Sequence, residues 1–283
     1  MGIFDGLESL GFSKLEKVDV YNEDHTGSKS NSTVIIENRA QEPAETDYIF
    51  DKTYVCPVCD NEFKSKTVKA GKVHLIGADT DLRPKYKGID SLKYDAILCP
   101  KCGYTALNRY FNYMTSGQAR LIRENISKNF KGIITGGDIV SYDEAITKHK
   151  LALLNAVVKK SSVSEKAYIC LKTAWLLRGK AESIGGSAPE SEEKAKLEAE
   201  ELQFIDNAYS GFMEAISREN FPMCGMDENT VMYLISDLAI RLKKYDEAGR
   251  LISRILTSRE ASERVKSKAR ELKDRLMEIT KEK

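Results

Sequence analysis

The sequence has few of the features that mark membrane proteins and strongly charged binding proteins. No apolar run in its 283 residues approaches the roughly 20 that a helix needs to cross a bilayer, so a transmembrane protein is excluded. Basic residues number 44 and acidic residues 43. The resulting net charge of +1 excludes a strongly basic nucleic-acid-binding protein and leaves only local charged patches to consider.

Catalytic sequence motifs are also missing. The chain has no phosphate-binding loop, no glycine pattern for dinucleotides, no His-Glu-x-x-His and no nucleophile elbow. Its three histidines, His25, His74 and His149, are isolated from one another in the sequence, and we expect His74 to be a surface or packed side chain. We therefore expect a protein that is not an enzyme and has no catalytic residues. An enzyme of unknown class is the less favoured alternative.

Length and composition predict a globular protein of more than one domain. At about 150 residues per domain, 283 residues correspond to two domains. Charged residues make up 31% and hydrophobic residues 41%, which is too apolar for a disordered chain. The first residues, MGIFDGLESLGF, carry acids in place of a basic start and have no uninterrupted apolar stretch, so they do not resemble a secretory signal. We expect a cytoplasmic protein whose six cysteines are reduced.

The balanced charge conceals a gradient along the chain. Residues 1–50 hold four basic and ten acidic residues, whereas residues 51–115 hold eleven basic and seven acidic ones. Together with the motifs described next, this gradient predicts three segments. They are an acidic, partly mobile N-terminal arm with a strand at 33–36 (residues 1–50), a four-cysteine zinc ribbon with an insertion (51–115) and a helical domain (116–283).

Two Cys-x-x-Cys turns give the strongest signal in the sequence. Cys56, Cys59, Cys99 and Cys102 form the two turns, and two intervening residues let both sulfurs of a turn face a single ion. Four thiolates are the set that zinc prefers in tetrahedral structural sites, where no coordination position is left for a substrate water. The spacing therefore predicts a structural zinc ion with these four cysteines as its ligands.

Other interpretations of the cysteines remain open. Iron in a rubredoxin-like site uses the same Cys-Pro-x-Cys-Gly turn that is present at Cys99–Gly103, and the donor set alone does not separate iron from zinc. Cys170 and Cys224 lie far from the turns in helical sequence, so we expect them to be buried, reduced thiols. The long separation between the turns predicts an insertion, about residues 71–92, that loops out of the ribbon.

From about Gln118 the sequence has helical periodicity. Ser141 and Glu144 form a Ser-x-x-Glu capping box, which predicts a helix start, and a long charged helix is predicted over residues 190–217. Tyr-Asp-Glu-Ala occurs at residues 142–145 and again 103 residues later, close to three periods of the tetratricopeptide repeat. The small–large–small triplets of such repeats correspond here to Ala145, His149 and Ala152; Ala208, Phe212 and Ala215; and Ala248, Ile252 and Ile255.

These patterns together predict an α+β fold that is mostly α, with a small β zinc ribbon followed by a tetratricopeptide-like helical array. The spacings between the triplets are irregular, so a plain helical bundle without repeats is the alternative. The last predicted helix has one apolar stripe among Lys and Arg side chains, which is typical of the cap that closes a solenoid.

Several stretches carry a resemblance to a known family. They are YVCPVC at residues 54–59, DLRPKYKGID at 81–90, Tyr94-Asp95, CPKCGY at 99–104 and AWL at 174–176. In these stretches the chain resembles the bacterial domain of unknown function 2225 family over about residues 50–250. The resemblance implies a bacterial cytoplasmic protein with a metal-binding ribbon and a tetratricopeptide-like helical part. It implies no activity.

The favoured function is protein recognition. Stacked helical repeats form surfaces that hold a peptide or a helix, and a structural zinc ribbon is a rigid docking module. We therefore expect a non-catalytic adaptor with a protein or peptide partner and no membrane contact. The alternative is a nucleic-acid-binding regulatory protein, because the ribbon segment carries basic residues with interleaved tyrosines: Lys64, Lys66, Lys69, Lys72, Arg83, Lys85 and Lys87, with Tyr86 and Tyr94.

Overall fold

A computed structural model of the protein describes residues 43–132, 137–184 and 192–281. Residues 1–42 of the predicted acidic arm, including the strand expected at 33–36, lie outside the described residues. The last residues of that arm form a short 3-10 helix, η2 (Glu45–Tyr48), and the start of the first strand.

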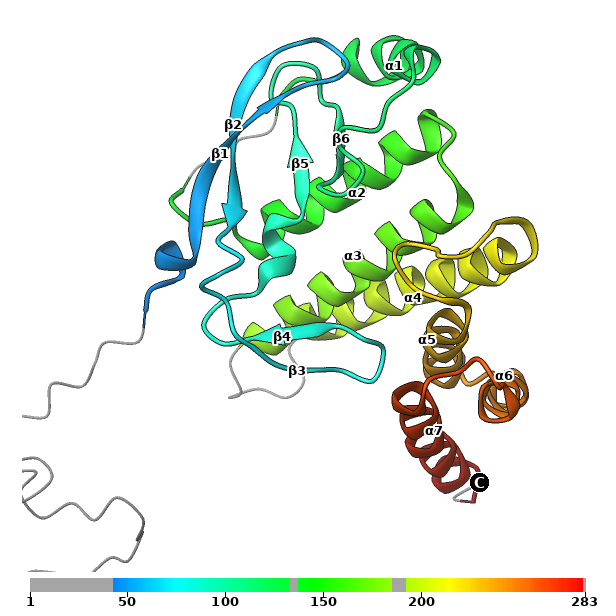
Figure 1. The fold of residues 1–283 in the computed structure, drawn as a ribbon. Coiled ribbons are helices and arrows are strands. Elements are labelled where there is room, and N and C mark those ends of the chain that lie inside the picture. The colour runs from blue at the N-terminus through cyan, green and yellow to red at the C-terminus, as the bar shows by residue number, and fades with distance from the viewer. Residues whose placement is uncertain (1–42, 133–136, 185–191, 282–283) are drawn as a thin grey trace, which may run out of the picture. The chain divides into compact units, whose positions relative to one another are not determined.

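The N-terminal part contains three antiparallel hairpins, each a sheet of two strands (Figure 1). A 3-10 helix, η3 (Ser91–Tyr94), separates the second hairpin from the third. The strand pairs are β1 (Ile49–Val55) with β2 (Glu62–Val68), β3 (Leu75–Ala78) with β4 (Pro84–Tyr86), and β5 (Ala96–Leu98) with β6 (Thr105–Leu107). The first and third hairpins turn at the two Cys-x-x-Cys motifs, so the metal-ligand candidates lie at their tips.

Helices make up most of the remaining described chain, and from α2 onward each α-helix packs against the next (Figure 1). They are α1 (Ser116–Ile122), the π-helical turn η4 (Arg123–Ser127), α2 (Tyr142–Val158), α3 (Val163–Ser183), α4 (Glu192–Arg218), α5 (Glu228–Arg241), α6 (Tyr245–Thr257) and α7 (Glu263–Lys281). The predicted α+β, mostly α class is confirmed. At the start of α2, the Ser141 side chain accepts a hydrogen bond from the Glu144 backbone N–H, as the capping motif predicted.

All nine residues of the three predicted triplets are buried. Burial of this kind is expected wherever a helix packs, and the helices that carry the triplets, α2, α4 and α6, have different lengths of 17, 27 and 13 residues. The tetratricopeptide-like repeat therefore stays a prediction.

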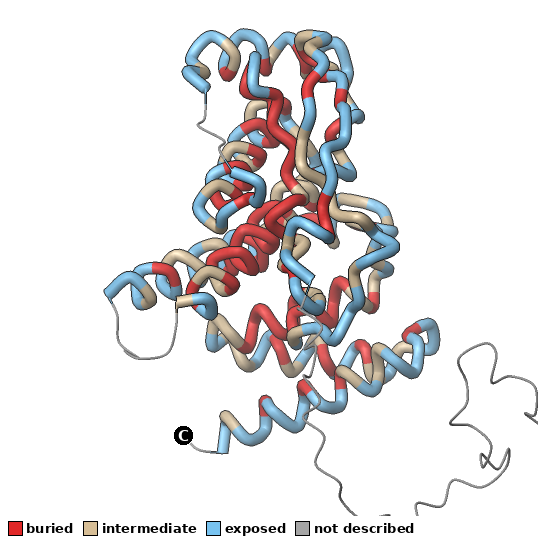
Figure 2. Tube along the Cα trace, turned by 90° about the vertical axis from the view of Figure 1, so that its left-hand side faces the viewer, coloured by how far each residue is buried: buried red, intermediate tan, exposed pale blue. Residues whose placement is uncertain are grey.

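One large hydrophobic core joins the helices to the segment between the cysteine turns. Ile89 and Leu92 belong to the same buried cluster as Leu171, Trp175 and Leu234 of the helices. Buried residues run through the middle of the molecule in Figure 2, while the outer sides of the helices are exposed. The three-segment division of the chain stays a prediction, but core residues are contributed from both sides of the predicted boundary at residue 115.

The predicted insertion, about residues 71–92, contains the β3–β4 hairpin and packs against the helices. The Asp81 side chain in the β3–β4 turn has no exposed surface, and it accepts a hydrogen bond of 2.7 Å from Nη2 of Arg178 in α3. Arg178 also donates to Asp79 at 3.1 Å and to Glu201 of α4 at 2.8 Å. Nη2 of Arg241 in α5 lies 3.6 Å from the same Asp81 carboxylate.

The neighbouring contacts extend this cluster to the C-terminal helices. Thr80 accepts a hydrogen bond of 2.8 Å from the Tyr233 hydroxyl through its backbone carbonyl. Asp237 of α5, also fully buried, is paired with Arg241 at 2.7 Å and with Arg275 of α7 at 3.4 Å. Because a buried charge is costly unless it is paired, these contacts hold the β3–β4 turn against α3, α5 and α7.

The pKa of Asp81 reflects this environment. Burial alone would raise it, but the hydrogen bond from Arg178 and the charges of Arg241 and Arg178 outweigh burial and keep the pKa below the ordinary value of 3.8. A group with a lowered folded-state pKa stabilises the fold in full above its unfolded pKa. That stabilisation is lost as the pH falls through the folded-state pKa.

We predict that Asp81→Asn lowers the free energy of unfolding by about 3 to 5 kcal/mol at neutral pH, because it leaves buried guanidinium groups without their carboxylate. Lys85→Met, which removes a half-exposed ammonium 2.7 Å from Asp79, is the control and should cost at most about 1 kcal/mol. Urea unfolding measures both. As the pH is lowered, the free energy of unfolding should fall less in Asp81→Asn than in the native protein. Equal free energies of unfolding for Asp81→Asn and Lys85→Met at neutral pH would contradict the prediction.

Candidate metal centre

The two cysteine turns have the same backbone geometry. In the first, the Asp60 N–H donates to the Cys56 carbonyl at 2.9 Å, and in the second the Gly103 N–H donates to the Cys99 carbonyl at 3.0 Å. Both donors have positive φ, 57° at Asp60 and 74° at Gly103. A Cβ at residue 103 would lie 2.5 Å from the ring of Phe130, so glycine is required there by close packing as well as by conformation.

The turns bring the four predicted ligands together. Sγ of Cys56 lies 3.6 Å from Sγ of Cys102, Sγ of Cys59 lies 3.7 Å from Sγ of Cys99, and all four sulfurs lie within 4.8 Å of one another. These separations are too long for disulfides, and all six cysteines are free. Four sulfurs at about 2.3 Å from a common ion would be about 3.8 Å apart in a tetrahedron. The cluster could therefore hold a metal ion.

The surroundings close the site on most sides. Cys56 and Cys99 have no exposed surface and Cys102 is 5% exposed, whereas Cys59 is partly exposed. The sulfurs belong to a small core that contains the aromatic rings of Tyr54, Phe63, Tyr104 and Phe111. With four protein donors and an apolar wall, the arrangement fits a structural ion and leaves no position for a substrate.

The electrostatics of the sulfurs also favour a bound cation. Hydrogen bonds with Cys56 and with Cys99 raise the pKa of Cys102 far above that of an ordinary thiol. Hydrogen bonds from Cys102 and Cys56 lower the pKa of Cys99 to about 2. The thiolate at Cys99 is therefore stabilised by the protons that Cys56 and Cys102 keep. A divalent cation would replace those protons and allow four thiolates.

The remaining candidates lie elsewhere. Cys170 is buried in α3, and Cys224 is half-buried and donates to the Ser164 carbonyl at 3.3 Å. His74 is exposed, and His25 lies outside the described residues. His149 is fully buried in α2, with Nδ1 2.8 Å from the Ala145 carbonyl oxygen, and burial lowers its pKa to about 4. Of these side chains, the structure brings none of the four that it describes into the cysteine cluster.

Four of the seven basic residues predicted for nucleic-acid binding are buried or held by other groups of the protein. Arg83 is 5% exposed, Lys66 pairs with Asp51 at 3.1 Å, and Lys69 donates to a backbone carbonyl. Tyr94, predicted to stack on a base, is 4% exposed and donates to Glu45 at 2.7 Å. The exposed members of the set are Lys64, Lys72, Lys85 and Lys87, of which Lys85 pairs with Asp79 at 2.7 Å.

Sequence reasoning missed several ion pairs with buried lysines near the ribbon, and two of these lysines lie on α2 and α3. Lys172 of α3 pairs with Asp95 at 2.5 Å, and Lys148 of α2 pairs with Glu144 at 2.6 Å. Lysines on a predicted helix are normally solvated, and nothing in the local sequence distinguishes these two from their exposed neighbours. Only the packing of the hairpins on α2 and α3 buries them.

Comparison with known proteins places the chain in one family. The family model described as "Uncharacterized protein conserved in bacteria (DUF2225)" matches residues 49–276, which include all four cysteines and most of the helical part. No curated protein and no solved structure matches the chain. None of the helices in the described ranges is both long enough and apolar enough to span a membrane.

We predict that the purified protein contains one tightly bound zinc ion per chain, and that Cys99→Ser loses it. Structural zinc contributes roughly 10 to 16 kcal/mol to small sites of this kind, so the variant should lose the folded structure of the two cysteine hairpins. Elemental analysis and thiol accessibility measure the two effects. Cys224→Ser, which changes a cysteine outside the cluster, should keep both the metal and the fold. A red, iron-type absorption spectrum, or the absence of any metal, would contradict the zinc assignment.

Proposed function

We propose that this chain, which belongs to the DUF2225 family of proteins conserved in bacteria, is a non-catalytic zinc-binding adaptor that holds a protein or peptide partner in the cytoplasm. The observation that carries the proposal is the closed cysteine site, in which protein sulfurs supply four donors around one position. A metal held in this way stabilises structure and cannot bind a substrate. The six free cysteines are consistent with a reducing compartment.

The metal would stabilise the junction between the hairpins and the helices. Gly103, next to Cys102, accepts a hydrogen bond of 3.3 Å from the fully buried Asn155 side chain of α2 through its carbonyl. The Phe130 ring after η4 packs against the same glycine. A zinc ion at the four cysteines would therefore fix the position of α2 as well as the tips of the hairpins.

The helices offer apolar surface for a partner. Leu154 and Val157 of α2 are 50% and 54% exposed, and their spacing of three residues places them on one side of the helix. Leu202 and Met213 of α4 are 48% and 40% exposed. Single exposed apolar side chains are common, but a pair on one helix face supports an interaction surface.

The alternative of nucleic-acid binding has less support. A nucleic-acid surface needs several unpaired cations that can reach phosphates. In this chain the Arg83 guanidinium is buried and the Lys85 ammonium is held by Asp79. Lys64, Lys72 and Lys87 are exposed without an ion-pair partner among the described residues, but neither tyrosine of the predicted set is fully exposed, since Tyr94 is buried and Tyr86 is partly buried.

We predict that the double variant Leu154→Asp, Val157→Asp weakens retention of protein partners by roughly tenfold or more, because it charges the apolar surface without touching the core. Lys72→Glu with Lys87→Glu is the matched control and should leave partner binding unchanged. Affinity purification of tagged full-length variants from bacterial extract, with quantitative identification of bound protein and nucleic acid, measures both. Metal content and thermal unfolding check that each variant is folded.

The result that would overturn the adaptor proposal is the reverse pattern. If the native protein retained nucleic acid, if that binding weakened steeply with salt, and if the lysine variant abolished it, the alternative function would replace the adaptor.

A further inference from the structure

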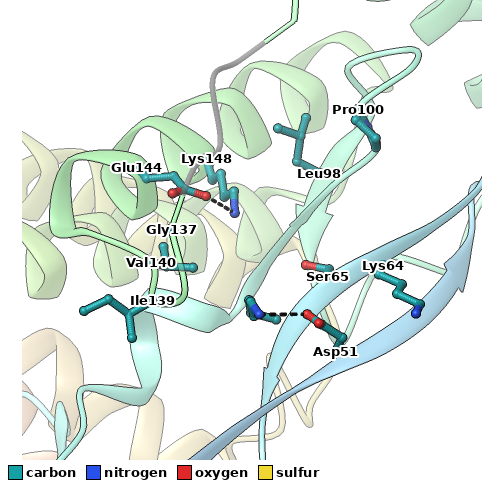
Figure 3. A pocket seen from close by; sticks show the side chains of 11 residues that line it. Asp51, Lys64, Ser65, Leu98, Pro100, Gly137, Ile139, Val140, Glu144 and Lys148 are labelled. Atoms are coloured by element: carbon teal, nitrogen blue, oxygen red, sulfur yellow. Dashed lines mark ion pairs between the residues drawn. The ribbon is translucent and has the colours of Figure 1, made fainter. Parts of the chain in front are cut away.

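A pocket of about 180 Å³ lies between α2 and the β1–β2 hairpin (Figure 3). Lys148 and Glu144 of α2 form one wall, and Asp51, Lys64 and Lys66 of the hairpin form the other. In Figure 3 the Lys148 side chain extends from the helix toward the strands, with its ammonium beside Glu144. No cysteine lines the pocket, although Leu98 and Pro100, which flank Cys99, do. The apolar pair Leu154 and Val157 lies on another side of α2, because the six residues from Lys148 to Leu154 turn the helix by about 240°.

Lys148 is the unusual member of this wall. Its side chain is only 9% exposed, although lysine is rarely buried to this extent. An ammonium has three N–H groups, and Glu144, at 2.6 Å, is the one charged partner that it has among the described residues. A buried ammonium that faces a pocket with donors to spare is suited to bind an oxygen acceptor.

The charged side chains that line the pocket indicate which net charge a ligand should carry. Three lysines and two carboxylates leave a net charge of +1. Each carboxylate already has a lysine partner, since Asp51 pairs with Lys66 at 3.1 Å and Glu144 pairs with Lys148. A single negative charge on a ligand would neutralise the pocket, whereas a phosphate dianion would leave it negative. Among the described residues, no arginine lines the pocket to supply the forked contact that favours phosphate.

The volume narrows the ligand further. Sites for cofactors and metabolites usually measure about 300 to 1,000 Å³. The present pocket, at about 180 Å³, is smaller and fits one side chain of a polypeptide. Ile139, 44% exposed, lines the pocket and offers apolar contact to the flanking part of such a chain.

We propose that this pocket binds a glutamate or aspartate side chain from an acidic segment of a protein partner. The carboxylate accepts hydrogen bonds from the Lys148 ammonium, and Lys64 and Lys66 contribute positive charge at the opposite wall. Glu144 orients Lys148 and competes with the incoming carboxylate for it. The proposal goes beyond the adaptor function, because it assigns a second recognition site and the chemistry of the group that this site takes.

Fluorescence polarisation with a labelled, end-blocked oligoglutamate peptide tests the site in the full-length protein. Lys148→Met should weaken binding by about tenfold or more, because it removes the buried cation. Glu144→Gln should strengthen binding several-fold, because it removes the competing charge and raises the net charge of the pocket. Lys150→Met is the matched control, since Lys150 lies on the same helix but pairs with Glu200 of α4, and it should leave binding unchanged.

Competition with unlabelled ligands shows which chemical group the pocket binds. Unlabelled oligoglutamate should displace the probe, whereas oligoglutamine, inorganic phosphate and single-stranded DNA should not do so at the same concentration. Absence of oligoglutamate binding, displacement by phosphate or DNA in preference to oligoglutamate, or weaker binding by Glu144→Gln would each overturn the proposal. The binding result for Lys148→Met tests the proposal only if the zinc content and thermal unfolding of this variant match those of the native protein. If they do not match, the binding result for Glu144→Gln is the test. Because Leu154 and Val157 are unchanged in all these variants, failure here leaves the adaptor proposal standing.

Discussion

The arrangement of the described chain depends on the buried carboxylate of Asp81. A carboxylate without exposed surface is tolerated only where cations surround it, and here they come from two helices, Arg178 of α3 and Arg241 of α5. The two arginines are 63 residues apart in the sequence, and each is about 100 residues or more from Asp81. Pairing this one carboxylate therefore holds the β3–β4 turn against two helices, α3 and α5, that are not consecutive along the chain.

The cysteine cluster and the Asp81 contacts hold two different parts of the N-terminal segment. The cluster joins the tips of the first and third hairpins and, through Gly103 and Asn155, the α2 helix. The Asp81 contacts join the second hairpin to α3, α5 and α7. Strands that would be marginal as isolated two-stranded sheets are thus supported at both places. The hairpins lie against the helices, so surfaces for a partner can include residues of both.

Much of the metal site could be predicted from the sequence, whereas the position of the insertion could not. A Cys-x-x-Cys turn is a local feature, and its geometry at Cys56 and Cys99 follows from a few neighbouring residues. The start of α2 at Ser141 is local for the same reason. The cations that pair with Asp81, and Glu182 beside Arg83, are distant in the sequence. From the sequence alone, the stretch between the turns therefore suggested a basic loop that could reach phosphates. The structure instead buries Arg83, with Nη1 3.0 Å from Glu182.

The burial of Lys148 could not be predicted from the sequence either. The pocket at Lys148 differs from the Asp81 contacts in the balance of positive and negative groups. Around Asp81, five cations face six carboxylates, so each positive group there already has a partner within the protein. The cations are Arg83, Lys85, Arg178, Arg241 and Arg275, and the carboxylates are Asp79, Asp81, Asp90, Glu182, Glu201 and Asp237. Around Lys148, three cations face two carboxylates across a pocket. A buried cluster in which every cation is paired with a carboxylate of the protein stabilises the fold without a ligand. A pocket with one cation in excess has its electrostatic energy lowered by an anionic ligand, which makes it the better candidate for recognition.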